Sequence, residues 1–167
     1  EPGSGKTHTI NEYVRYLREH EVEPAITAST GIAATHIHGQ TIHSWAGLGV
    51  RRHLSEYDLD AIATTEYLVK RIRSTKVLII DEVSMIDGPT LQMVSDVCKA
   101  IKHKEEPFGG IQVVLVGDFF QLPPINRGGG ELLFAFQSTA WQELSPLICY
   151  LSEQHRQEDE QFLALLS

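Results

Sequence analysis

Cysteine and long apolar runs are both scarce in this sequence. Its 167 residues contain two cysteines, Cys98 and Cys149. Each lies in an apolar run, so we expect small, reduced core residues of an intracellular protein, with a disulfide between them as the disfavoured alternative. No run of about 18 apolar residues occurs, which excludes a membrane-spanning helix, and no signal peptide is recognisable. The length suits one domain, with room for a small insertion.

Basic residues are also in short supply. Lysine and arginine number 14 against 22 aspartates and glutamates, which gives a net charge of −8. This balance argues against a general polyanion-binding surface, so any nucleic acid must meet a local groove or basic residues elsewhere in a longer protein. An apolar content of 42% and a charged content of 22% are ordinary for a globular domain.

The first seven residues, Glu-Pro-Gly-Ser-Gly-Lys-Thr, form the most informative motif. They match the phosphate-binding loop G-x-x-x-x-G-K-[ST] except for its leading glycine. Glycines let backbone N–H groups turn inward around phosphates, while Lys6 suits the β- and γ-phosphates and Thr7 suits Mg²⁺. A Gly-rich turn that happens to precede Lys-Thr is the alternative. The predicted nucleotide-binding residues are Pro2, Gly3, Ser4, Gly5, Lys6, Thr7 and His8.

Strands and helices are expected to alternate along the chain. Apolar patterns predict strands at 24–29, 76–80, 111–116 and 147–151. Helices are predicted directly after the phosphate loop, at 32–37, from Gly88 to the break at 108–110, and at 159–166. The segment 47–74 has no clear periodicity of apolar residues, which suggests an insertion on the surface of the domain. This order predicts a parallel α/β sheet with functional residues at the strands' carboxyl ends. A phosphate loop normally follows a central strand, which here would precede residue 1. We therefore expect a gap in the sheet and a larger folded unit.

Asp81 and Glu82 follow the most apolar of these runs. The first carboxylate is predicted to hold Mg²⁺, usually through water, opposite Thr7. The second is predicted to orient and deprotonate the attacking water. An acidic strand-to-loop junction without a catalytic role is the alternative.

Two further polar side chains are catalytic candidates. Gln121, in Gly-Asp-Phe-Phe-Gln-Leu-Pro-Pro at 117–124, can contact both a terminal phosphate and a water, which suits a sensor of hydrolysis. Arg156 is a candidate arginine finger that stabilises charge on the departing phosphate. Read alone, the first is also compatible with a Pro-terminated loop and the second with a solvated arginine.

Short hydroxyl side chains gather beside two glycines in the segment 30–44. Thr30, Thr41 and Ser44, beside Gly31 and Gly39, suit contacts with a sugar-phosphate backbone. His43 is a candidate for stacking on a base.

Aromatic and imidazole side chains of the same segment have competing interpretations. Trp45 suits base stacking and core packing equally well. His36, His38 and His43 crowd together, but their spacing matches no zinc pattern, and packing or backbone contacts are the favoured interpretation.

Taken together, these motifs resemble the PIF-type DNA helicases of superfamily one, relatives of RecD. The matching segments are 2–7, 27–34, 40–44, 79–85, 107–110 and 116–124. Asp-Glu-Val-Ser-Met followed by Gly-Asp-x-x-Gln-Leu-Pro-Pro is highly specific, and Arg156-Gln157 resembles the family's next motif.

The resemblance implies a P-loop NTPase fold: a RecA-like parallel sheet flanked by helices in residues 1–157, a small wedge subdomain at about 47–74, and the start of a linker or second motor domain at 158–167. It implies ATP and Mg²⁺ as cofactors, and single-stranded DNA bound by Thr30, Gly31, His43 and Ser44. The implied activity is ATP-driven 5′→3′ translocation with unwinding of duplex or G-quadruplex junctions. We expect a monomer in the nucleus or mitochondrion of a eukaryote, or in the cytoplasm of a bacterium or virus.

Parts of the family pattern are missing, namely the adenine-reading segment before the loop and the second motor domain with its second arginine. The fragment alone is therefore expected to be weakly active or inactive. Two other classes remain open at this point. One is a P-loop switch or small-molecule kinase without a DNA role, against which the Glu82 position argues, and the other is a scaffold that binds nucleotide without hydrolysing it.

Overall fold

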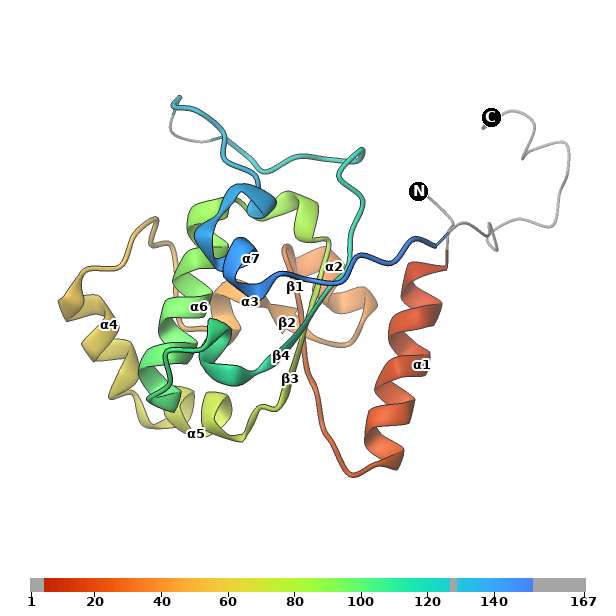
Figure 1. Ribbon diagram of the computed structural model, residues 1–167, viewed down its shortest axis with the longest axis horizontal. Helices are drawn as coiled ribbons and strands as arrows, with labels where there is room; N and C mark the ends of the chain where they lie inside the picture. Colours follow the sequence, from red (N-terminus) through yellow and green to blue (C-terminus); the bar gives the residue numbers. More distant parts are fainter. Residues whose placement is uncertain (1–4, 127–128, 152–167) are drawn as a thin grey trace, which may run out of the picture.

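One parallel sheet organises the molecule. The computed structural model describes residues 5–126 and 129–151 (Figure 1). The strands, in the spatial order β2-β1-β3-β4, are β1 (Ala25–Ala28), β2 (Gln40–Thr41), β3 (Val77–Asp81) and β4 (Gln112–Leu115), and every neighbouring pair is parallel. The predicted parallel α/β fold is confirmed. The expected gap is wrong, because each strand hydrogen-bonds directly to the next and leaves β2 and β4 as the edges of the described sheet.

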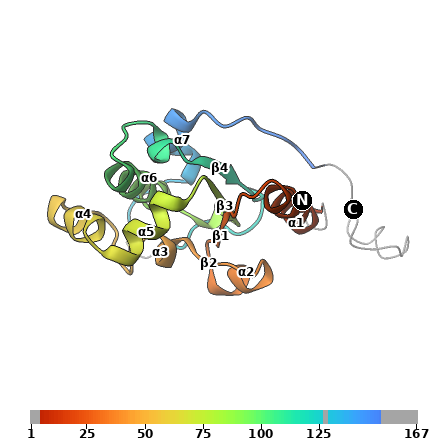
Figure 2. The same ribbon diagram turned by 90° about the horizontal axis from the view of Figure 1, so that it is seen from below.

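Helices cover both faces of this sheet. α1 and α2 lie on one side, and α3 to α7 lie on the other (Figure 2). All of β3 is buried, as its unbroken apolar run requires of a strand covered on both faces. The helices are α1 (Lys6–Glu19), α2 (Gly31–His36), α3 (Ile42–Trp45), α4 (Glu56–Ala63), α5 (Glu66–Ser74), α6 (Gly88–Lys102) and α7 (Thr139–Leu144).

The helix predicted after the phosphate loop packs as its spacing requires. Ile10, Val14 and Leu17 of α1 are its buried residues and contact Val77 and Ile79 of β3. This packing fixes the N-terminus of α1 near the carboxyl end of the sheet.

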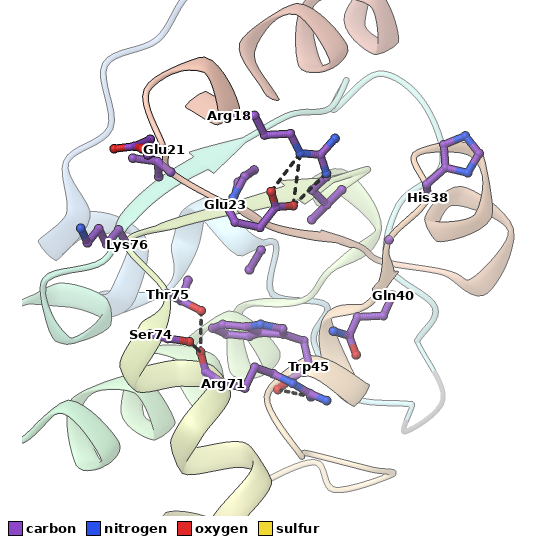
Figure 3. Close-up of a pocket in the computed structure, with 15 residues that line it drawn as sticks. Arg18, Glu21, Glu23, His38, Gln40, Trp45, Arg71, Ser74, Thr75 and Lys76 are labelled. Atoms are coloured by element: carbon purple, nitrogen blue, oxygen red, sulfur yellow. Dashed lines mark hydrogen bonds and ion pairs between the residues drawn. The ribbon is translucent and has the colours of Figure 1, made fainter. Parts of the chain in front are cut away.

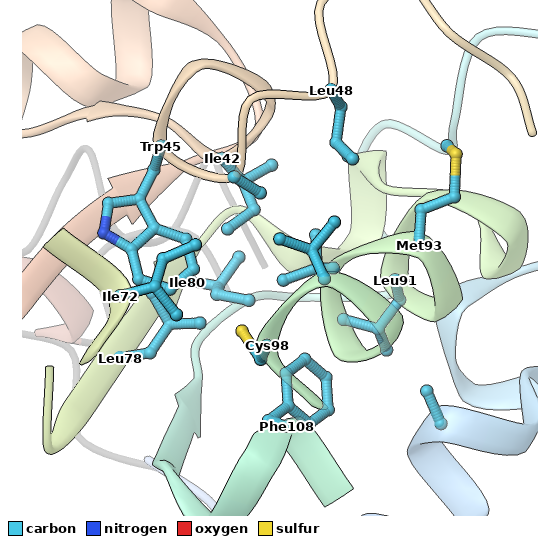
Figure 4. Close-up of a cluster of buried hydrophobic side chains, with 14 of the residues drawn as sticks. Ile42, Trp45, Leu48, Ile72, Leu78, Ile80, Leu91, Met93, Cys98 and Phe108 are labelled. Atoms are coloured by element: carbon cyan, nitrogen blue, oxygen red, sulfur yellow. The ribbon is translucent and has the colours of Figure 1, made fainter. Parts of the chain in front are cut away.

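The segment 47–74 contributes to the main core, which the sequence did not predict. It forms α4 and α5, and Leu48, Ile62, Leu68 and Ile72 join the large apolar cluster on that face. Figure 4 shows Leu48 and Ile72 in this cluster. Ser55 starts α4 with a capping box that includes Asp58. Each helix is short, so its apolar spacing is too brief to stand out in the sequence.

α6 is the central helix of that face. Its N-cap is Asp87, whose carboxylate accepts a hydrogen bond from the Thr90 N–H at 2.8 Å, and proline occupies the first turn. The helix predicted from Gly88 is confirmed, and its apolar residues Leu91, Val94, Cys98 and Ile101 are all buried. Burial raises the pKa of the Cys98 thiol to about 12.

The segment 147–151 differs from its prediction as a strand. It forms no strand, and Leu147 is 91% exposed. Cys149 is exposed as well, so its prediction as a core residue is wrong, whereas that for Cys98 is confirmed. Both thiols are free, so no disulfide joins them. A strand requires a hydrogen-bonded neighbour, and this arm runs past the end of the sheet without pairing (Figure 1). The helix predicted at 159–166 lies outside the described residues.

No helix within the described ranges is both long and apolar enough to cross a lipid bilayer.

Candidate nucleotide and DNA site

The carboxyl ends of β1, β3 and β4 lie side by side, and we call this end of the sheet the carboxyl edge. The Ser29 N–H after β1 donates to the Asp81 carbonyl at 3.1 Å, and the Val83 N–H after β3 donates to the Val116 carbonyl at 3.0 Å. A Cβ on Gly117 would lie 3.0 Å from Val83 Cγ1, so glycine permits this close approach. The segments that follow β1, β3 and β4 are therefore held side by side.

Asp81 has 8% of its surface exposed, the same fraction as Asp118, the other buried carboxylate near this edge. Burial raises its pKa, while the Glu82 N–H, which donates to Oδ1 at 2.9 Å, and the positive charge of Lys6 act in the opposite direction. Lys6 of α1 and Asp81 of β3 thus interact electrostatically. A desolvated carboxylate beside this end of α1 has the donor chemistry that Mg²⁺ requires.

The N-terminus of α1 suits a phosphate group. Gly5 adopts the left-handed conformation, φ 82°, and no side chain caps the helix. The first-turn N–H groups and the positive end of a 14-residue helix therefore face the space before Gly5. Thr7 and His8 are exposed in this first turn. These features fit a phosphate chain and its cation. Pro2, Gly3 and Ser4, also predicted for this site, lie outside the described residues.

Glu82 and Gln121 follow adjacent strands. Glu82 has a left-handed backbone, φ 53° and ψ 44°, which is a strained conformation for a residue with a side chain. Its side chain and that of Gln121 are half-buried, and the Gln121 N–H donates to the Asp118 carbonyl at 3.0 Å. Arg156 lies outside the described residues.

Asp118 is a residue to which the sequence analysis assigned no role. It is buried, its Oδ1 accepts a hydrogen bond from the Phe120 N–H at 2.9 Å, and it interacts electrostatically with Lys6. Lys6 therefore interacts electrostatically with two carboxylates, one at the end of β3 and one after β4. The signal was present, because Asp118 follows a predicted strand within a motif already noted.

The predicted DNA contacts occupy the starts of two short helices beside this edge. Thr30 caps α2, accepting from the Ala33 N–H at 3.2 Å, and Thr41 caps α3, accepting from the Ser44 N–H at 3.2 Å. Gly31 is exposed, and a Cβ there would meet nothing within 4 Å. The backbone of this turn is consequently open to a ligand.

His43 and Trp45 of α3 have different surroundings. His43 is half-buried, and desolvation lowers its pKa, partly offset by the negative charge of Asp87. Its imidazole is therefore neutral at pH 7, which suits a base contact better than a phosphate ion pair. Trp45 is 1% exposed and belongs to the core, so the packing interpretation is confirmed. His36, His38 and the other described residues form no cluster able to hold a metal ion.

A separate cavity of about 760 Å³ opens at the opposite, amino ends of the strands. Its wall includes the edge of Trp45, Arg71 and the Arg18–Glu23 ion pair, whose atoms are 2.8 Å apart (Figure 3). None of the predicted nucleotide or DNA residues lines it, so it is distinct from the candidate site.

Comparison with known proteins decides the family. A model of the PIF1-like helicases matches residues 1–164. The chain belongs to the PIF1-like helicase family. It is 53% identical over 158 residues to the ATP-dependent DNA helicase Pif1 of Psychrobacter, which covers 93% of this chain and 24% of that protein. It is 38% identical to the PIF1 helicase of Candida albicans, covering 99% of this chain and 19% of that protein.

Solved Pif1 structures share the fold. The crystal structure of Candida albicans Pif1 superposes with a TM-score of 0.89 at 39% identity, over 99% of this chain and 38% of that one. Bacteroides Pif1, in complex with ADP-AlF3 and single-stranded DNA, superposes with a TM-score of 0.82 at 31% identity, over 99% and 40%. The predicted resemblance is confirmed, and none of these relatives supports a switch or metabolite kinase. The chain spans about a fifth to a quarter of the length of these two curated Pif1 relatives.

Proposed function

We propose that this chain is a RecA-like motor domain of an ATP-dependent DNA helicase, within residues 1–157. The observation that carries the proposal is the electrostatic interaction of Lys6 with Asp81 and Asp118 at the carboxyl ends of the strands. The Thr30–Gly31 turn lies at the same ends of the strands. The segment 47–74 is proposed to include the wedge, and 158–167 to begin the link to a second motor domain.

The residues at this edge have complementary roles in ATP hydrolysis. When bound, ATP–Mg²⁺ supplies the phosphoanhydride bond and a Lewis acid that polarises it. Lys6 and the α1 N–H groups bind phosphate oxygens, and Thr7 and Asp81 hold the cation. The Glu82 carboxylate accepts a proton from the attacking water, which Gln121 orients. Arg156 stabilises the charge on the leaving phosphate.

DNA is proposed to bind along the starts of α2 and α3. The Gly31 backbone and the hydroxyls of Thr30, Thr41 and Ser44 contact sugar and phosphate, and neutral His43 contacts a base. A solved structure of Bacteroides Pif1 is bound to single-stranded DNA, and another solved Pif1 structure concerns DNA unwinding at forked double-stranded DNA, which supports this assignment. Translocation 5′→3′, G-quadruplex unwinding, a monomeric state and an intracellular site of action belong to the same proposal.

A single substitution tests the hydrolysis step. Glu82→Gln in the full-length protein keeps the size of the side chain but removes the base, so turnover of ATP should fall by about 10²-fold or more, while nucleotide affinity stays close to wild type. Steady-state phosphate release and nucleotide titration measure the two quantities. The exposed Glu12 of α1 provides a matched control, because Glu12→Gln should leave turnover unchanged. Full turnover by Glu82→Gln would contradict the assignment.

A further inference from the structure

Two unusual hydroxyl groups flank the proposed general base. In the ranges 5–126 and 129–151, the buried side-chain polar atoms without a hydrogen-bond partner are the Ser29 and Ser84 hydroxyl oxygens and the Trp45 indole nitrogen. A buried hydroxyl without a partner is unfavourable, and such groups are concentrated where a ligand or a second state of the site supplies the partner. Ser29 and Ser84 bracket Asp81 and Glu82, whereas Trp45 lies elsewhere, at the cavity at the amino ends of the strands.

The pairing of β1 with β3 places Ser29 beside Glu82. Ala28 is paired with Asp81, so the next residue along each chain is Ser29 on one side and Glu82 on the other. The Ser29 N–H fixes this register by donating to the Asp81 carbonyl at 3.1 Å. Ser29 therefore lies next to the proposed base on the β1 side of β3.

Glu82 itself lacks support from neighbouring side chains. No hydrogen bond from another residue of the described ranges holds its carboxylate, and its backbone is in the strained left-handed region at φ 53°. A base that must aim at one water molecule needs an orienting partner, as catalytic bases generally do. The unpaired donor and the unsupported acceptor are adjacent in the sheet.

We propose that Ser29 is a positioning residue for Glu82. In the hydrolysis-competent state the Ser29 hydroxyl donates a hydrogen bond to the Glu82 carboxylate and aims it at the attacking water. The inference rests on the proposed ATPase function. Ser29 also directly precedes Thr30, so single-stranded DNA bound at the start of α2 is one residue away from the group that orients the base.

The test uses the full-length protein, with kcat and KM for ATP measured with and without single-stranded DNA, and the melting temperature measured without nucleotide. Ser29→Ala should lower the DNA-stimulated kcat about tenfold, the effect of losing a hydrogen bond to a charged group, with KM little changed. Its melting temperature should stay equal or rise, because the variant removes an unpaired buried polar group. Ser29→Thr keeps the hydroxyl and should retain most of the turnover.

Thr27 offers a matched control on the same strand. It lies two residues earlier, is fully buried, and its hydroxyl donates to the Ile79 carbonyl at 2.7 Å. Thr27→Val therefore removes a hydrogen bond that is already formed. The melting temperature should fall while kcat is unchanged, the opposite of the pattern expected for Ser29→Ala.

The outcomes separate this inference from the proposed function. Full turnover by Ser29→Ala, in a protein that Glu82→Gln inactivates, would overturn the role of Ser29 alone. A parallel loss of kcat and melting temperature in Ser29→Ala would show a structural role and overturn it as well. The double variant Ser29→Ala/Glu82→Gln should be no slower than Glu82→Gln, because Ser29 acts through Glu82. A wild-type protein that does not hydrolyse ATP would overturn the proposed function itself.

Discussion

At the scale of single residues, the candidate site depends on carboxylates in unequal environments. Asp81 is buried, and the positive charge of Lys6 partly offsets the rise in its pKa that burial causes. Glu82 next to it is half-buried, and no side chain among the described residues orients its carboxylate by a hydrogen bond. The sequence predicted both, because the acidic pair directly follows an unbroken apolar run in a chain that also contains Gly-Lys-Thr. It did not predict a role for Ser29, whose significance comes from its hydrogen bond to Asp81, 52 residues further along the chain. It also assigned no role to Asp118, although this residue stands in a motif that the sequence analysis noted.

His43 makes a prediction about pH. Its folded-state pKa lies below the ordinary 6.5, chiefly because of desolvation, so the folded chain binds fewer protons there than the unfolded chain. The contribution of neutral His43 to the free energy of unfolding is fully present above pH 6.5. It is lost as the pH falls through the folded-state pKa of His43. Thermal unfolding between pH 7.5 and about 5 should show wild type losing stability more steeply than His43→Gln.

The exposed His53 supplies the control for this comparison. His53→Gln should follow the wild-type dependence on pH. Parallel curves for wild type and His43→Gln would show that His43 is not desolvated in the folded protein.

At the scale of elements, the sequence predicted those whose signal is local. α1, β3 and α6 each carry a full apolar pattern, and each forms as expected. α4 and α5 were missed because they have 8 and 9 residues, too few for a clear period, and acquire their stability from the core that they help to form. The prediction of a strand at 147–151 was wrong because a strand also depends on non-local contacts. Residues with strand-like preferences form no strand without a neighbouring strand to pair with.

The end of α1 allows a stabilising substitution. Glu21 adopts φ 60° in a Schellman motif, in which its N–H donates to the Arg18 carbonyl at 3.0 Å and the Val22 N–H donates to the Leu17 carbonyl at 2.8 Å. Glycine takes this conformation without steric penalty, so Glu21→Gly should raise the free energy of unfolding by about 0.5–1 kcal/mol. Chemical denaturation monitored by circular dichroism measures the change.

The same substitution in the middle of α1 should have the opposite sign. Glu12→Gly places glycine in a helix interior and should lower the free energy of unfolding by roughly 0.5–1 kcal/mol. Equal effects at both positions would contradict the left-handed cap.

At the scale of the whole molecule, one edge of the sheet is less covered than its centre. β3 is buried throughout, whereas the residues of β4 are half-buried or exposed, and 147–151 runs past the sheet unpaired. We propose that a further strand of the full-length protein pairs with β4 and supports the phosphate loop. The sequence analysis expected such a strand but expected its absence to leave a gap within the sheet, because no local pattern in the chain shows which strand it would pair with.

A longer version of the chain tests this proposal. A protein that includes the residues preceding position 1 should melt higher than the 167-residue chain by several degrees, since about 1 kcal/mol corresponds to 2–4 °C at this size. Amide hydrogen exchange at Val113 and Leu115 should slow in the longer protein, and exchange in α5 should not. Equal exchange at β4 in both would argue against an added strand.

The hydrogen bond between Ser29 and the Asp81 carbonyl limits how the molecule can move. It extends the ladder in which Ala25–Ala28 pair with Leu78–Asp81 by one further hydrogen bond, at 3.1 Å. The strand that leads into the proposed DNA-binding turn and the strand that ends at the proposed magnesium ligand are therefore joined along their length and should move together. Any stepping along a nucleic acid strand would then come from this block tilting as a unit against another part of the protein.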